Sequence, residues 1–208
     1  DSMGLHEMSQ RLAIRARVPM PRLYTIPDNS SNAFAVGRNQ HQASIVVTQG
    51  IMASLNYDEL EAVFAHEFAH IKRGDIVSNS VAALFGALIL FGTFSGPMKK
   101  VSGMRVIMMA ILAPVAAVVI RFLVSSNIES KADLLATQTS TLPDVLATAL
   151  RKIYTQNSKL PLGFANPAFG HLYIVNPFAN RVLLGTVIGM FEHRSLPDER
   201  IATLLNTR

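Results

Sequence analysis

Two histidines and the glutamate that follows the first of them form the part of this sequence best suited to catalysis. His66 and His70 are four residues apart, so on an α-helix both imidazoles project from one face and can bind a single metal ion. Glu67 is turned away from that face but remains close enough to act on a metal-bound water. The spacing therefore predicts a hydrolytic metal site. The alternative is a pair of histidines satisfied by ordinary hydrogen bonds beside an exposed glutamate.

The flanking sequence predicts that this motif lies on a helix. Asp58 and Glu59 provide an acidic start, and either Asn56 or Asp58 can cap the first turn. Gly74 follows the motif as a helix stop. The intervening side chains are small or apolar and would keep bulk water away from the histidines. Because unpaired ionisable groups are costly to bury, this setting favours a metal ion that pairs with them.

A second pair of candidate ligands follows much later in the chain. Glu129 and Asp133 are four residues apart and share one helix face. An apolar helical hairpin before them would return its second arm to the point where its first arm began, beside His66 and His70. Glu129 would then be the third ligand and leave a fourth position for water, while Asp133 would hydrogen-bond the outer nitrogen of a ligating histidine. The alternative is an ordinary solvated helix face.

The hairpin is predicted from two uncharged or nearly uncharged stretches. Residues 76–94 and 106–124 each contain about 19 residues, close to the roughly 20 needed to cross a bilayer. Pro114 and Arg121 interrupt the second stretch. We expect the hairpin to be transmembrane, and the alternative is burial against other hydrophobic elements. The hairpin would divide the domain that carries the metal site into an N-terminal half at 1–75, the hairpin itself at 76–124 and a C-terminal half at 125–208.

Composition supports contact with a membrane rather than with nucleic acid. Half of the residues are hydrophobic and 16% are charged, whereas about a quarter are charged in ordinary soluble domains. The net charge is +5, but the basic residues are scattered, so a lipid bilayer is favoured and no nucleic-acid partner is expected. The absence of cysteine leaves histidine and carboxylate as metal ligands. Because the chain opens at Asp1 without a methionine, we expect it to be part of a longer protein.

The remaining patterns predict an α+β fold that is mainly helical. An amphipathic helix is expected first, then three short strands that form a small antiparallel sheet next to the metal-binding helix. An exposed edge of this sheet could accept an extended peptide as an additional strand, or could bind nothing. Besides the metal-binding helix, the hairpin and the Glu129 helix that continues from it, the predicted helices and strands lie at 4–17, 22–26, 32–37, 43–48, 143–154, 172–175, 182–191 and 198–205.

These segments together resemble the HtpX family of bacterial membrane zinc metallopeptidases. This gluzincin-type family is related to the CAAX-processing and Oma-type proteases. The histidine–glutamate motif alone is weakly specific, but the ordered set of matching segments covers nearly the whole chain and is strongly specific. The segments that carry the resemblance are 32–37, 65–70, 74–75, 112–114, 129–133, 146–150, 171–177 and 197–201.

The resemblance implies a zinc-dependent endopeptidase with one Zn²⁺ per chain. His66, His70 and Glu129 would bind the zinc, and Glu67 would be the general base. The resemblance also implies that Asn32 binds the substrate backbone.

The last site residue that the resemblance implies is His193, in an oxyanion-stabilising role. From its position alone, His193 could equally lie in a surface loop. The implied substrates are damaged or misfolded membrane proteins, cleaved in stress-related quality control at the bacterial inner membrane by an active site that faces the cytoplasm. Two alternatives stay open: a zinc hydrolase of non-peptide substrates, and a catalytically silent membrane scaffold that keeps zinc for folding.

Overall fold

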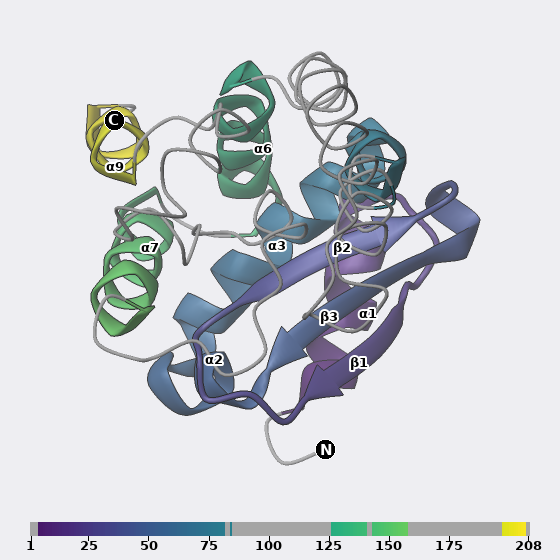
Figure 1. Cartoon of the computed structure of the whole chain (residues 1–208). Coiled ribbons are helices and arrows are strands. Elements are labelled where there is room, and N and C mark those ends of the chain that lie inside the picture. Colours follow the sequence, from purple (N-terminus) through teal and green to yellow (C-terminus); the bar gives the residue numbers. More distant parts are fainter. Residues whose placement is uncertain (1–3, 82–83, 85–125, 141–142, 158–196, 207–208) are drawn as a thin grey trace, which may run out of the picture.

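The computed structural model describes residues 4–81, 84, 126–140, 143–157 and 197–206. Within them, helices lie behind a three-stranded sheet, and the long helix α3 (Tyr57–Arg73) lies between the sheet and the C-terminal helices (Figure 1). The predicted mainly helical α+β class is confirmed at this level. Apart from 76–81 and 84, the predicted hairpin lies outside the described residues, as do the predicted strand at 172–175 and the predicted helix at 182–191. No helix in the described part of the chain has both the length and the apolar character that crossing a membrane requires.

The first helix, α1, spans Leu5–Ala16 and confirms the predicted amphipathic helix. Met8, Leu12 and Ala16 recur on one face and are buried. The helix ends where Arg17 adopts a left-handed conformation (φ 57°) and its backbone N–H bonds the last turn. Helix α1 packs behind the sheet and beside α3 (Figure 1).

The sheet contains β1 (Arg22–Ile26), β2 (Ala33–Gly37) and β3 (Ala43–Thr48) in the order β1-β3-β2. Strand β3 pairs antiparallel with β2 but parallel with β1. The predicted antiparallel sheet is therefore wrong in its topology, because the sheet is mixed. Consecutive strands do run in opposite directions, but β3 inserts between β1 and β2, and the loop at 27–32 crosses the end of β3.

Helix α2 (Gln49–Ser54) leads into α3 (Tyr57–Arg73), the helix that carries the histidine motif. Asn56 caps α3 and forms a capping box with Glu59, so the first of the two predicted caps is the one used. Gly74 ends the helix in a left-handed conformation (φ 81°), as predicted. A second helical segment begins immediately after it and covers 75–81.

Three helices complete the described structure: α6 (Ser126–Thr139), α7 (Pro143–Asn157) and α9 (Pro197–Asn206). Helices α6 and α7 pack on α3, and α9 packs on α7 and α6 (Figure 1). Large apolar side chains from α3 and α7 fill the shared core. The fully buried ones are Leu60, Phe64, Phe68, Ile71, Leu146, Leu150 and Ile153.

Candidate metal centre

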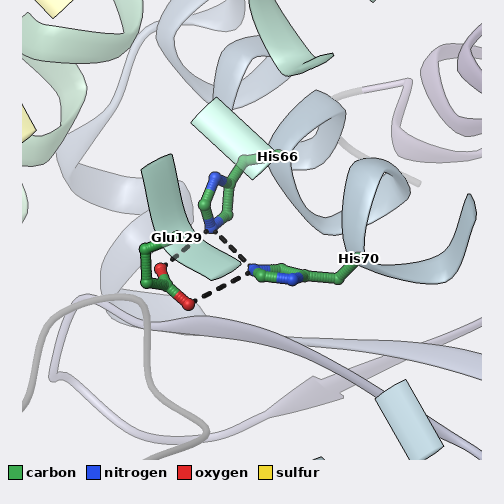
Figure 2. Close-up of side chains that lie close together, drawn as sticks. All are labelled: His66, His70 and Glu129. Carbon is green, nitrogen blue, oxygen red and sulfur yellow. Dashed lines mark hydrogen bonds and ion pairs between the residues drawn. The ribbon is translucent and has the colours of Figure 1, made fainter. Parts of the chain in front are cut away.

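Helix α3 places both histidines of the motif in the protein interior. His66 and His70 are 1% and 3% exposed, and their rings meet edge to face with centroids 4.6 Å apart. Helix α6 lies against α3 and brings Glu129, in its first turn, to the same point (Figure 2). The predicted convergence of Glu129 with the two histidines is confirmed, and each of the three residues offers a ligand atom within 4.8 Å of the others.

The separations of these atoms fit a tetrahedral metal site. The two histidine Nε2 atoms are 3.0 Å apart, and the Glu129 oxygens lie 3.5 Å from Nε2 of His66 and 3.6 Å from Nε2 of His70 (Figure 2). Ligands about 2.0–2.1 Å from one zinc ion in tetrahedral geometry lie about 3.3–3.4 Å from each other. The three side chains could therefore hold a zinc-sized cation with little rearrangement.

An aspartate also contacts each histidine at Nδ1, the ring nitrogen on the side away from the proposed metal position. Nδ1 of His66 lies 2.8 Å from Oδ1 of Asp133, and Nδ1 of His70 lies 3.2 Å from Oδ2 of Asp75. In the neutral form of each ring, which is the form that binds a metal, these contacts favour a proton on Nδ1, so both Nε2 atoms would direct lone pairs toward the same point. Lone pairs that face each other at this distance need a cation or a proton between them.

Each of these aspartates is in turn bound by an arginine. Arg200 on α9 donates from Nε and Nη2 to the two oxygens of Asp133, at 2.9 and 2.7 Å. Arg73 donates from Nε to Oδ2 of Asp75 at 2.8 Å. Each histidine thus begins a His–Asp–Arg series of contacts. The series from His66 ends at the buried Arg200, and the series from His70 ends at the more exposed Arg73.

Charge also favours a divalent cation at this site. Glu67, Glu129 and Asp133 are buried carboxylates, and Arg200 is the buried guanidinium beside them. A metal ion binds imidazole in its neutral form, and in that state three negative charges face one positive charge, so a divalent ion would cancel the remaining two. The donor set of two imidazoles and one carboxylate is typical of hydrolytic zinc.

The pKa values of the buried groups show how strongly they interact. Burial lowers the pKa of His66, but the Asp133 carboxylate outweighs that effect and the pKa of His66 rises to about 9. Burial raises the pKa of Asp133, but the charges of Arg200 and His66 lower it further, to about 2. Burial lowers the pKa of Arg200, and Asp133 and Glu129 together bring it above its usual range. Asp133 and Arg200 therefore favour each other's charged form and make a buried ion pair.

Glu67 is buried on α3, and its charge contributes to raising the pKa of Arg200, so its carboxylate faces the same region. Asn32 is buried in the loop before β2, where its backbone N–H donates to Oγ1 of Thr48 and its carbonyl accepts from the Thr48 N–H. Within the described structure, Oδ1 of Asn32 has no hydrogen-bond partner. His193 lies outside the described residues.

Two residues of this centre, Asp75 and Arg200, were not predicted from the sequence to belong to it. Asp75 follows the helix stop at Gly74, and the turn there carries it back to His70. An aspartate directly after the glycine that ends the helix was the available signal. Arg200 comes from the last described helix and lies in the segment 197–201 that carries the family resemblance, but no local pattern ties it to the metal site, because a single arginine near an acidic helix start normally lies in solvent.

Comparison with known proteins agrees with this geometry. The profile of peptidase family M48 matches residues 2–208. A protease HtpX homolog of Campylobacter curvus is 34% identical over 98% of this chain and 74% of its own length. A protease HtpX homolog of Syntrophobacter fumaroxidans is 35% identical over 98% of this chain and 76% of its own length. No solved structure gives a significant match. This chain belongs to peptidase family M48 and is similar to HtpX proteases over nearly its whole length.

Proposed function

We propose that this protein is a zinc-dependent endopeptidase in which His66, His70 and Glu129 bind one zinc ion and Glu67 is the general base. The observation that supports this most directly is the convergence of the three side chains. Their ligand atoms meet in a buried site, and the Nδ1 atom of each imidazole is already engaged by an aspartate. Membership of a peptidase family gives the reaction, hydrolysis of a peptide bond.

The protein groups can account for the proton transfers of that reaction. When bound, zinc supplies a Lewis acid that polarises a carbonyl and makes a coordinated water acidic near neutral pH. Glu67 takes the proton from the attacking water and delivers it to the leaving amine. Its burial at 3% exposure limits access of bulk water, which strengthens the charge interactions on which these transfers depend.

Two further residues complete the proposed substrate site. Asn32 would hydrogen-bond the substrate backbone, consistent with a buried side-chain oxygen that has no partner among the described residues. Its position is well defined, because the side chain of Asn157 binds both the N–H and the carbonyl of the preceding residue, Ser31, at 2.9 Å. His193 would stabilise the developing oxyanion. An extended substrate could lie along the edge of the sheet and use backbone hydrogen bonds.

The proposed substrates are damaged or misfolded membrane proteins, cleaved at the cytoplasmic face of a bacterial inner membrane during stress. Support comes from the similarity to HtpX proteases and from the apolar composition of residues 76–124. That segment would be a membrane hairpin, inserted between an N-terminal half at 1–75 and a C-terminal half at 125–208. No observation favours the non-peptide hydrolase or the silent scaffold over this assignment.

The decisive experiment replaces Glu67 with glutamine. Glu67→Gln keeps the size and shape of the side chain but replaces one carboxylate oxygen with an amide nitrogen, which removes its charge and its basicity. We expect zinc content to stay at one per chain while cleavage of an unfolded protein substrate falls by about 10²- to 10⁴-fold. Metal analysis and a peptide-release assay measure the two quantities. Glu61→Gln on the same helix is the matched control, since Glu61 faces Arg11 and Arg15 away from the metal centre. Full activity in Glu67→Gln would refute the assignment of the base.

A further inference from the structure

We propose that Arg200 is a positioning residue of the metal centre, which holds Glu129 and Asp133 in metal-binding orientation before the ion arrives. The inference rests on the proposed function, because it concerns the same three ligands. All three guanidinium nitrogens take part. Nε and Nη2 bind Asp133, and Nη1 lies 3.2 Å from Oε2 of Glu129. One side chain thus contacts both the third ligand and the aspartate behind His66.

The shape of arginine explains why this residue suits the position. Its planar guanidinium presents donors in a fixed fork, so two carboxylates can be bound in defined directions at once. The side chain is 3% exposed, and charge-assisted hydrogen bonds are strong in such surroundings. Lysine would keep the charge but offer one nitrogen in place of three, and it would lose the relative orientation of Glu129 and Asp133.

A purely structural role does not account for a charged group here. Burying an ion pair is often no better for stability than packing apolar side chains of similar volume. The contacts of Arg200 instead serve the ligands. Glu129 Oε2 is held between Arg200 and Nε2 of His66, and Asp133 Oδ1 is held between Arg200 and Nδ1 of His66. Without the guanidinium, the two carboxylates of α6 would repel each other and turn apart.

The second His–Asp–Arg series provides a comparison within the same molecule. Arg73 binds Asp75, which binds His70, but the Arg73 side chain is 26% exposed and sits on the helix end. Water can replace much of the hydrogen bonding and charge that Arg73 supplies to Asp75, because an exposed ion pair contributes little free energy to the folded state. Arg200 is buried, so water cannot take over its contacts with Asp133 and Glu129 in the same way. The same substitution at the two arginines should therefore have unequal effects.

The test compares Arg200→Lys with Arg73→Lys in the full chain. Zinc affinity is measured by competition with a chelator, and the visible spectrum of the cobalt(II)-loaded protein reports the ligand geometry. We expect Arg200→Lys to weaken zinc binding by about 10- to 100-fold and to alter the cobalt spectrum. Arg73→Lys should weaken zinc binding by at most about fivefold, as for an exposed ion pair. Metal-free unfolding temperatures, recorded by circular dichroism, separate a loss of fold from a loss of ligand orientation.

The outcomes distinguish this inference from the proposed function. If Arg200→Lys binds zinc as tightly as Arg73→Lys with an unchanged cobalt spectrum, the positioning role is overturned while the endopeptidase assignment stands. If the unsubstituted chain binds no zinc, both are overturned. If Arg200→Lys does not fold, Arg200→Ala is refolded with methylguanidinium or with methylammonium. Selective recovery of zinc binding with methylguanidinium supports the role of the fork, and equal or absent recovery overturns it.

Discussion

Removing the metal should destabilise the folded protein, because the fold brings together buried negative charges that a bound divalent cation would neutralise. Glu67, Glu129 and Asp133 are buried with Arg200 as the buried positive charge beside them. In the unfolded chain, Glu129 is far in sequence from His66, so a complete site exists only in the folded state. Zinc binding is therefore coupled to folding.

The size of the effect follows from this coupling. A ligand present at 1,000 times its dissociation constant, with no affinity for the unfolded state, stabilises the fold by about 4 kcal/mol. For a chain of 208 residues, each kcal/mol shifts the unfolding temperature by about 2–4 °C. Stripping zinc from a saturated sample should therefore lower the unfolding temperature by about 8–16 °C.

The assay is thermal unfolding in excess zinc and in excess chelator, with Glu129→Gln as the key variant. The amide keeps the shape of the side chain but is a poor zinc ligand, so zinc should stabilise this variant much less than the parent chain. Lys131→Ala, at an exposed position on the same helix, is the matched control and should respond to zinc as the parent does. The reasoning is refuted if the chelator leaves the unfolding temperature unchanged, or if zinc stabilises Glu129→Gln and the parent equally.

Two further substitutions test the elements that position the site. Asn56→Ala removes the capping box of α3, in which the Asn56 side chain accepts from the Glu59 N–H at 2.9 Å, and should cost about 1 kcal/mol in thermal unfolding. Asn56→Asp keeps the acceptor and should cost less, so equal losses would contradict the capping role. Asn157→Ala leaves the buried N–H and carbonyl of Ser31 unpaired and should cost about 1–3 kcal/mol for each group in urea unfolding. It should also raise KM more than it lowers kcat, because the Asn32 loop shifts; a change in kcat alone would count against a substrate role for that loop.

The sequence predicted the parts of the site that depend on local pattern. The capped helix, its glycine stop and the shared face of His66 and His70 all follow from short-range rules, and the structure confirms them. We predicted the approach of Glu129 from an expected apolar hairpin, most of which lies outside the described residues. The structure confirms the approach itself, since α6 lies against α3.

Tertiary relations were harder to predict than local ones. The strands were expected in the correct places, but strand pattern alone does not reveal that β3 inserts between β1 and β2. The contacts of Arg200 depend on how α9 packs against α6, and nothing near position 200 in the sequence encodes the positions of Glu129 and Asp133. The contact of Asp75 with His70 was easier to predict, because it depends only on the local turn at Gly74 that ends the helix.

The unequal burial of the two arginines has a consequence for how the centre responds to change. On the His70 side, solvent reaches the Arg73–Asp75 pair and can adjust to a shift in either residue. On the His66 side, Asp133 and Arg200 are enclosed and share their contacts with Glu129, so a shift in one must displace the others. Substitutions in α9 that move its backbone should therefore impair zinc binding even though no residue of α9 is a proposed ligand. Substitutions of similar size on the exposed face of α1 should not, because α1 lies behind the sheet and well apart from α9 (Figure 1).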